Sequence, residues 1–172
     1  MSMEPHGKEA CRQVKVTVAT VSDTRTLEDD ESGRIIIDLL GEKDHIITSR
    51  HLLKNIRGSI ESFIFSVASA EKAEVLILTG GTGISPRDVT VDIVEKLLEK
   101  KIDGFGELFR HLSFQEIGTR AMMSRATAGL IGRLIVIAIP GSPHAARLAM
   151  ERLILPELSH MAFEALKGSQ MQ

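Results

Sequence analysis

The sequence predicts an α/β fold, a three-layer sandwich in which a mostly parallel sheet is flanked by helices. Apolar, β-branched runs at 14–21, 45–53 and 75–79 are each followed by a segment whose apolar residues have helical spacing. The run from Val75 to Leu78 is apolar without interruption, which is typical of a strand buried on both faces of a parallel sheet. A glycine-rich turn, Gly80-Gly81-Thr82-Gly83, joins this strand to the next helix.

Length and composition restrict the classes of function. With 172 residues, 43% of them hydrophobic, the chain fits one domain with a proper core. We divide it into a flexible arm (1–12), a single domain (13–166) and a C-terminal tail (167–172). The net charge of −2 makes nucleic acid an unexpected partner, and the single cysteine, Cys11, excludes a disulfide framework or a thiolate metal cluster. Without a membrane-length apolar stretch or a signal peptide, we expect a cytoplasmic protein.

The first strand, 14–21, runs into a polar cluster, Ser22-Asp23-Thr24-Arg25, at its carboxyl end. After the acidic residues of 28–31, apolar spacing predicts a short helix that ends at Gly41. A second strand is predicted at 45–53. The amphipathic helix that follows has Asn55 as its expected N-cap and an apolar stripe of Ile56, Ile60, Phe63, Ile64 and Val67.

The central strand ends at Thr79 and leads through the glycine turn to a helix. We expect Thr90 to be its N-cap, Asp92 to lie in its first turn, and its apolar stripe to be Ile93, Val94, Leu97, Leu98 and Ile102. The glycines let the backbone turn tightly and approach a ligand closely. A strand, a glycine loop and a helix N-terminus together form an anion site. A turn whose glycines serve packing alone is the alternative.

Neither of two familiar phosphate-binding motifs fits this loop. A P-loop needs Lys followed by Ser or Thr after its last glycine, but Ile84-Ser85 stands there, and the dinucleotide fingerprint would place its third glycine at Pro86. Arg87 is suited to neutralise an anion, and Asp88 is suited to hold a Mg²⁺ ion that bridges phosphates. The loop therefore predicts a nucleotide or phosphoester site.

The second half of the chain begins with a helix near Gly104-Phe105-Gly106. Segments 124–130 and 134–139 are predicted to be a strand pair joined around 131–133. Ser142 as N-cap and Pro143 at the first helical position predict the start of the last helix or helix pair, which we expect to run to about 166 with a break near Pro156.

Ligands of such sheets bind at the carboxyl ends of the strands, where 22–25, 80–88 and 141–143 are expected to meet. This places Asp23 and Asp88 near one bound anion. Other candidates have weaker signals. The six histidines lack metal-ligand spacing, and His144 alone is expected to face the cleft. Glu107 and Arg110 fit either a surface ion pair or a cleft or subunit contact, and Ser124-Arg125 fits either strand entry or the site.

These segments, in this order, resemble the MoaB/Mog family, the molybdopterin-binding proteins of molybdenum cofactor biosynthesis. The resemblance covers about 14–158, and segments 113–119 and 124–126 are closer to the MoaB branch. It is carried by Ser22–Arg25, Asp30-Glu31-Ser32-Gly33, Thr79–Gly83, Arg87-Asp88-Val89-Thr90, Gly104-Phe105-Gly106-Glu107, Ser113-Phe114-Gln115-Glu116-Ile117-Gly118-Thr119, Ser124-Arg125-Ala126 and Leu134–Pro143.

The resemblance implies a MoaB/Mog-like three-layer fold that assembles as a homotrimer or hexamer. It implies that molybdopterin is adenylylated with Mg-ATP, that pyrophosphate is released, and that a partner enzyme then inserts molybdate. Asp88 matches the family's essential aspartate, with Asp23 and position 55 beside it. The substrate-binding positions would be Ser22, Thr79, Gly80, Gly81, Thr82, Gly83, Arg87, Gly141 and Ser142.

One position departs from the family pattern. Active members carry a second acidic residue just after the second strand, where this chain has Leu53-Lys54-Asn55-Ile56-Arg57. Asn55 carries no charge with which to hold a divalent ion. Three hypotheses follow: a molybdopterin adenylyltransferase, a non-catalytic molybdopterin-binding protein of the same pathway, and a small regulatory domain for another phosphorylated ligand.

Overall fold

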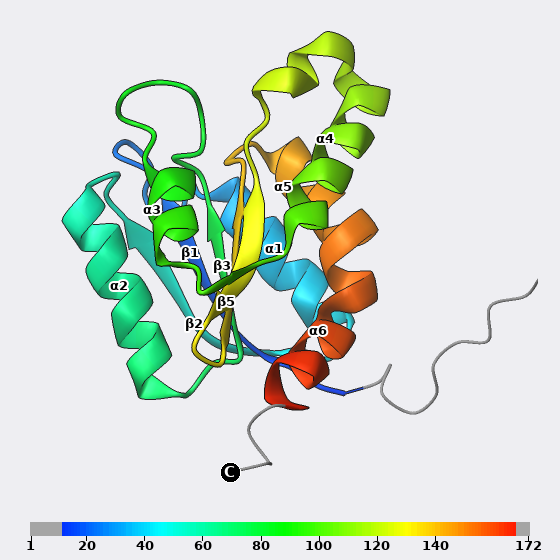
Figure 1. The fold of residues 1–172 in the computed structure, drawn as a ribbon. Coiled ribbons are helices and arrows are strands. Elements are labelled where there is room, and N and C mark those ends of the chain that lie inside the picture. Colours follow the sequence, from blue (N-terminus) through cyan, green and yellow to red (C-terminus); the bar gives the residue numbers. More distant parts are fainter. Residues whose placement is uncertain (1–11, 168–172) are drawn as a thin grey trace, which may run out of the picture.

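Parallel strands form the centre of one six-stranded sheet with the order β2-β1-β3-β6-β5-β4. The computed structural model describes residues 12–167 (Figure 1). Strands β2, β1, β3 and β6 are mutually parallel, and β5 is antiparallel to β6 and to the short edge strand β4. The strands are β1 (Lys15–Val21), β2 (Ile46–Leu53), β3 (Val75–Thr79), β4 (Lys100–Lys101), β5 (Thr127–Ile131) and β6 (Leu134–Ile139).

Helices cover both faces of the sheet, which confirms the predicted three-layer α/β sandwich (Figure 1). One layer consists of α2 (Arg57–Ala70) and α3 (Thr90–Leu97). The opposite layer contains α1 (Glu31–Glu42), α4 (Asp103–Ile117), α5 (Pro143–Ala149) and α6 (Leu155–Lys167). A 3₁₀ segment, Gly118–Met123, follows α4, and a π-helical segment, Met150–Ile154, joins α5 to α6.

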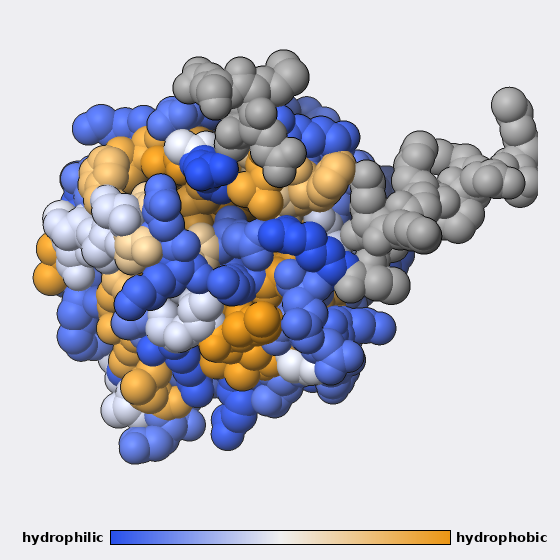
Figure 2. All heavy atoms as spheres, turned by 90° about the horizontal axis from the view of Figure 1, so that it is seen from below, coloured by the Kyte–Doolittle hydropathy of each residue, from blue (hydrophilic) through white to orange (hydrophobic). Residues whose placement is uncertain are grey.

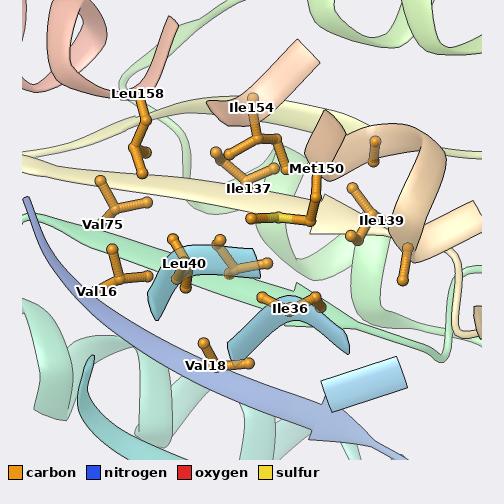
Figure 3. Packing of buried hydrophobic residues seen from close by; sticks show 14 of the residues in the cluster. Val16, Val18, Ile36, Leu40, Val75, Ile137, Ile139, Met150, Ile154 and Leu158 are labelled. Atoms are coloured by element: carbon orange, nitrogen blue, oxygen red, sulfur yellow. The ribbon is translucent and has the colours of Figure 1, made fainter. Parts of the chain in front are cut away.

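The central strands bury both faces, because alternate side chains enter two separate cores. In β3, Val75 and Ile77 enter the core beneath α1, α5 and α6, whereas Leu76 and Leu78 enter the core beneath α2 and α3. Helix α5, the π-helical segment and α6 follow one another directly, and we call them together the α5–α6 rod. Figure 3 shows the first of these cores, in which side chains of α1 and of this rod meet those of β1, β3 and β6. All five residues of β3 are buried, as their unbroken apolar run predicts.

Two predicted helix caps are displaced, because the predictions considered side-chain type and not the backbone path. The N-cap of α2 is Ile56 without a side-chain hydrogen bond, and Asn55 lies one residue earlier with its side chain on another loop. The N-cap of α3 is Val89, and Thr90 is the first helical residue. Ser142, by contrast, caps α5 as predicted and accepts a hydrogen bond from the Ala145 N–H.

Three predicted helix ends are also wrong. Helix α1 continues past Gly41 to Glu42, because Gly41 faces solvent and does not take the left-handed conformation that ends helices. Helix α3 ends at Leu97, since Lys100–Lys101 pairs with β5 and removes Ile102 from the predicted stripe. The rod after Pro143 is not broken at Pro156, because the π turn before it accommodates a residue that has no N–H to donate.

Parts of the predicted terminal segments lie inside the domain. Arg12 forms an ion pair with Glu74, and its carbonyl accepts the hydroxyl of Ser159. Lys167 is the last residue of α6. The rest of the predicted arm and tail, with Cys11, lies outside the described residues. Among residues 12–167, no helix is both long enough and apolar enough to span a bilayer.

The opposite end of the sheet carries a different surface. Figure 2 shows this end as a mainly hydrophilic face with apolar patches between the charged side chains. A hollow of about 560 Å³ lies among Ala68, Ala73, Ile131, Leu134 and Leu166, with Glu71, Glu74, Glu99 and Arg133 also lining it. No residue of the predicted site contributes to this hollow, so it is separate from the candidate site.

A buried carboxylate starts α1 and ties it to the sheet. Asp30 is fully buried and accepts hydrogen bonds from the Gly33 N–H (3.0 Å), from the Thr20 hydroxyl (2.7 Å) and from Arg50 (2.9 Å). Arg50 belongs to β2, so one side chain joins a helix to two strands. A Cβ atom at Gly33 would collide with Asp30 Oδ2 and lie 2.8 Å from the Thr20 hydroxyl oxygen.

We expect Gly33→Ala to destabilise the protein by about 2–3 kcal/mol, because the added methyl group must displace the Asp30 carboxylate. Gly41→Ala is the matched control, since it lies in the same helix and a Cβ there meets nothing within 4 Å. The control should stabilise by about 0.5–1 kcal/mol through helix propensity. Urea unfolding of both variants measures the difference, and two variants of equal stability would contradict the packing argument.

Candidate functional site

The predicted polar loops meet at the carboxyl end of the sheet. Ser22–Arg25 follows β1, Gly80–Asp88 follows β3, and Gly141-Ser142 follows β6. These three strands are neighbours in the order β1-β3-β6, so their ends lie side by side, and the Gly80–Asp88 loop projects from this end of the sheet (Figure 1). Asn55 joins them from the end of β2, the neighbour of β1 on the other side.

Two glycines bring the loops into direct backbone contact. Gly80 has φ +99°, and a Cβ atom there would collide with the carbonyl oxygen of Val21. A Cβ atom at Gly141 would lie 2.8 Å from the Gly80 Cα. The N–H of Gly80 donates to the Ile139 carbonyl (3.0 Å), so the ends of β3 and β6 continue as one close-packed unit. Only glycine fits these two contacts.

Thr79 supports this unit from below. Its side chain is fully buried and its hydroxyl donates to the Pro140 carbonyl (3.0 Å). Thr79 was predicted to bind substrate. Because its side chain is buried and its hydroxyl hydrogen is used by Pro140, the structure shows it bracing the two loops, and its contact with substrate stays a prediction.

The glycine loop carries four consecutive backbone donors. Within residues 12–167, the N–H groups of Gly81, Thr82, Gly83 and Ile84 have no protein acceptor. Gly81 has φ +63°, and its carbonyl accepts the Thr90 N–H (2.9 Å), which fixes the loop at the start of α3. A curved run of free N–H groups beside a helix start is a binding arrangement for a phosphate or another anion.

Three polar residues form a chain across the mouth of the site. Asp23 Oδ1 accepts the backbone N–H of Asn55 (2.9 Å), and the side-chain amide of Asn55 donates to Asp88 Oδ1 (3.4 Å). The Asp88 carboxylate lies over the glycine loop, since a Cβ atom at Gly83 would be 2.6 Å from its Oδ2 atom. The structure thus brings together the three residues that the sequence predicted to be catalytic.

Two buried polar atoms beneath the loop have no partner among the described residues: Asn55 Oδ1 and Thr90 Oγ1. Both face the position of Gly81, where a Cβ atom would collide with the Thr90 oxygen and lie 2.9 Å from the Asn55 oxygen. A buried unpaired oxygen costs free energy unless it gains a partner. These atoms therefore favour an arrangement that is completed by a ligand.

The donor set suits magnesium held mainly by a ligand's phosphates. Mg²⁺ takes oxygen ligands and commonly binds through one or two carboxylates together with substrate phosphates. Asp88 supplies a carboxylate and Asn55 an unpaired amide oxygen next to it. Within 12–167, no group of three His, Cys, Asp or Glu side chains could hold a metal by itself. The residues fit a metal that arrives with a phosphorylated ligand.

Comparison with known proteins identifies the family. A family model described as "Probable molybdopterin binding domain" matches residues 17–160 of this chain. The chain belongs to this family. The matched segment begins within β1 and ends within α6, so it includes all the loops that form the candidate site.

Relatives of similar length carry a consistent name. The chain is 47% identical over 165 residues to molybdenum cofactor biosynthesis protein B of Bacillus cereus. The aligned residues cover 95% of this chain and 98% of the relative. It is 44% identical over 168 residues to the protein of that name from Bacillus subtilis, with coverage of 97% and 99%. The chain thus matches these relatives over nearly their whole length and belongs to molybdenum cofactor biosynthesis.

Solved structures of the family share the fold. A crystal structure of molybdenum cofactor biosynthesis protein B matches with a TM-score of 0.88 at 47% identity, covering 90% of this chain and 97% of that chain. The tungsten cofactor synthesizing protein MoaB from Pyrococcus furiosus matches with a TM-score of 0.81 at 31% identity, with coverage of 90% and 98%. The predicted MoaB/Mog-like fold is confirmed.

The candidate site has an anchor on the β6 side that sequence reasoning missed. The Gly141 carbonyl accepts the Ser32 hydroxyl (2.7 Å) and Arg25 Nη1 (3.2 Å), and Arg25 lies 4.0 Å from Asp30. The buried Asp30 therefore supports the site through α1 and Arg25. An aspartate directly before a helical apolar pattern is an N-cap signal that could have indicated Asp30, but its pairing with Arg50 has no local signal.

A second anchor lies on the β3 side. Arg125, which the sequence left open between strand entry and site, donates to the Gly83 carbonyl (3.2 Å) and to both carboxylate oxygens of Asp92 (2.7 and 3.1 Å). The hydrogen bonds to Asp92 raise the pKa of Arg125, and the same bonds from Arg125 lower the pKa of Asp92. Arg125 thus joins the glycine loop to α3.

The remaining predicted binding residues differ in how they face the site. Arg87 is exposed and forms no ion pair within 12–167, so its charge is free for an anion. Thr82 is 5% exposed, so a ligand would meet its backbone more than its side chain. Ser22 uses its hydroxyl oxygen to accept the N–H groups of Thr24 and Arg25, which shapes the first loop. Ser142 is exposed at the start of α5.

The weaker candidates lie away from the glycine loop. His144 Nε2 pairs with Glu116 of α4 (2.6 Å), on the side of α5 that faces α4. Glu107 and Arg110 are both exposed on α4 and do not form the i,i+3 ion pair that was one of the two alternatives for them. These two side chains are therefore available to a neighbouring molecule.

The state of Asp30 makes stability depend on pH. Burial opposes its ionisation, but hydrogen bonds from Thr20, the Gly33 N–H and Arg50 outweigh that effect and lower its pKa below 3.8. A carboxyl group with a lowered pKa stabilises the folded state above its unfolded-state pKa, and this stabilisation is lost as the pH falls through its folded-state pKa.

We expect Asp30→Asn to lower the free energy of unfolding at pH 7 by about 3 kcal/mol, because Arg50 loses a buried partner. The gap between wild type and variant should narrow as the pH falls below about 4, where the wild-type carboxylate becomes protonated. Urea unfolding at pH 7 and at several values from 4.5 to 2.5 measures this gap. A gap independent of pH would show that the ionised form of Asp30 does not carry the stabilisation.

Proposed function

We propose that this protein binds molybdopterin and adenylylates it with Mg-ATP, giving adenylyl-molybdopterin and pyrophosphate. The observation that carries the proposal is the run of unpartnered N–H groups from Gly81 to Ile84, with Asp88 beside it. Both substrates are phosphorylated, so a loop that holds phosphate oxygens next to a metal-binding carboxylate meets the needs of the reaction. Membership of the molybdopterin-binding family supports the choice of substrate.

The reaction needs positioning more than covalent catalysis. A phosphate oxygen of molybdopterin attacks the α-phosphorus of ATP, the bond from that phosphorus to the β-phosphate oxygen breaks, and pyrophosphate leaves with the electron pair. The nucleophile is already an anion, so no general base is required. Groups that hold the two phosphates in line and neutralise the charge on their oxygens provide the rate enhancement.

The predicted residues around the glycine loop have distinct roles in this scheme. The backbone N–H groups of Gly81–Ile84 hold the phosphate oxygens of the ligand, and Arg87 neutralises their charge. Asp88, with Asn55 beside it, would hold the Mg²⁺ that accompanies ATP, and Asp23 orients Asn55 through its backbone N–H. When bound, Mg²⁺ neutralises charge on the transferring phosphates.

A non-catalytic molybdopterin-binding protein of the same pathway is the second candidate. Asn55 favours it, because an amide stands at the position where active members of the family carry a carboxylate. The amide donates to Asp88 and so offsets the negative charge of Asp88 without a metal. A single carboxylate binds Mg²⁺ more weakly than a pair. The two candidates share the anion loop and differ only in turnover.

Incubation with molybdopterin and Mg-ATP, followed by mass detection of the product, tests the proposal. We expect Asp88→Asn to reduce turnover by about a hundredfold or more, roughly 3 kcal/mol, while molybdopterin affinity changes little, because the backbone holds the phosphate. Asp38→Asn is the control: Asp38 is an exposed residue of α1 and should leave turnover unchanged. Asn55→Asp should raise turnover by supplying a second carboxylate.

The outcomes separate the two candidates. An active wild type that is indifferent to Asp88→Asn would remove the metal role of Asp88. An inactive wild type that binds molybdopterin and is not rescued by Asn55→Asp would establish the binding protein in place of the enzyme. A protein that binds neither substrate would rule out both.

The expected homotrimer or hexamer requires a contact surface, and we place it on α4 and the 3₁₀ segment after it. Five exposed apolar side chains gather there: Leu108, Phe114, Ile117, Met122 and Met123. They adjoin a hollow of about 340 Å³ lined by Arg110, His111, Phe114, Thr119, Ala121 and Met122. A second copy of this chain fits this surface, because Glu107 and Arg110 present opposite charges beside it and can pair between copies.

Light scattering at micromolar concentration should give the mass of a trimer or hexamer for the wild type. Phe114→Asp should shift the mass toward the monomer, because it places a charge in an apolar contact. Phe65→Asp is the matched control: Phe65 is 50% exposed on α2, on the opposite layer, and its substitution should leave the mass unchanged. A monomeric wild type would eliminate the assembly.

A further inference from the structure

The glycine loop has a single tether between Thr82 and Arg87. Gly81 is fixed by the Thr90 N–H, and Asp88 by Asn55. Between these two ends, the hydrogen bonds within the loop are the two that Ser85 accepts, from the N–H groups of Arg87 and Asp88. Among the described residues, the one hydrogen bond that joins this stretch to the rest of the protein is from Arg125 Nη1 to the Gly83 carbonyl (3.2 Å).

This hydrogen bond fixes the direction of a backbone donor. In a trans peptide the C=O and the following N–H point in opposite directions. The described residues contain no cis peptide bond, so the Ile84 N–H points away from Arg125 while the Gly83 carbonyl points toward it. Rotation of this peptide would exchange a donor for a carbonyl oxygen and would repel an anion. Arg125 therefore selects the orientation of the peptide in which the loop offers donors.

Arg125 is itself held in place. Asp92 accepts two parallel hydrogen bonds from its guanidinium, Nη2 to Oδ1 at 2.7 Å and Nη1 to Oδ2 at 3.1 Å. A two-point contact of this kind fixes the plane of the guanidinium as well as its position. The contact is also an ion pair, so the carboxylate of Asp92 offsets the charge of the guanidinium. Arg125 is thus better placed to orient the loop than to attract an anion by charge.

We propose that Arg125 is a positioning residue that presents the Gly83-Ile84 peptide to the phosphorylated ligand, and that Asp92 holds Arg125 in the required orientation. The proposal rests on the phosphate-binding role of the glycine loop proposed above. It assigns a function to the Ser124-Arg125 motif beyond strand entry. It also gives the first turn of α3 a function in addition to its favourable interaction with the helix dipole.

A comparison of charge with geometry tests this role. Inorganic pyrophosphate serves as the probe, and calorimetric titration gives its affinity for wild type, Arg125→Lys, Asp92→Ala and the double variant. Arg125→Lys keeps the charge but loses the planar fork, and we expect its affinity to fall about tenfold. Asp92→Ala removes a negative charge, so charge alone would tighten binding. If Asp92 instead acts by positioning Arg125, Asp92→Ala should weaken pyrophosphate binding about tenfold. The double variant should then bind no more weakly than either single variant.

Tryptic cleavage after Arg87 gives a readout that does not depend on the ligand. Release of the tether should speed cleavage at this exposed arginine in Arg125→Lys and Asp92→Ala. Arg147→Ala is the control, because Arg147 pairs with Glu151 on the surface of the α5–α6 rod, and it should change neither cleavage nor affinity. Thermal unfolding of each variant verifies that it is folded.

The possible results separate this role from the proposed function. Tighter binding in Asp92→Ala, or unchanged affinity and cleavage in Arg125→Lys, would overturn the positioning role while leaving the function intact. A wild type that does not bind pyrophosphate would overturn the phosphate role of the loop and, with it, this inference. Weaker binding together with faster cleavage in both single variants supports it.

Discussion

The close approach of Gly80 to Val21 on one side and to Gly141 on the other is the constraint on which the site depends. Three strands end at the same level, and only residues without a Cβ atom let their loops touch there. Thr79 ties the same unit together from below by bonding to Pro140. Because the backbone is held this close to the sheet at Gly80, the run of unpartnered N–H groups that follows begins at a fixed point on the edge of the sheet.

Local signals were sufficient to predict the layers and the end of the sheet at which the polar loops meet. Val75–Leu78 is apolar at every position, Ser142 is followed by proline, and glycines cluster after β3. Each of these elements can therefore be predicted from a few consecutive residues. The errors are also local. Asn55 and Thr90 are good capping residues placed one residue from the true caps, because tertiary contacts decide where their side chains point.

The contacts of Arg125 and Arg50 that support the site could not be predicted from the sequence, because they join residues that are distant along the chain. Arg125 is 42 residues from Gly83 and 33 from Asp92, and Arg50 is 20 residues from Asp30. An arginine in a sequence can pair with many carboxylates, and only the fold selects one. Asn55 was noticed as a missing carboxylate, whereas its role as a bridge between Asp23 and Asp88 emerged only from the geometry.

The π-helical segment has a consequence for how the C-terminal rod is compared or redesigned. Met150, Ile154, Leu158 and Ala162 are all buried at a spacing of four residues. In a regular helix such a stripe would drift around the axis by about 40° at each step, and the wider π turn offsets part of that drift. A helical wheel drawn continuously from Pro143 to Lys167 would therefore assign the wrong phase to one half of the rod. Deleting a single residue within 150–154 would restore a uniform helix and leave the core-facing stripe of α6 near its present orientation, because the π turn holds one extra residue.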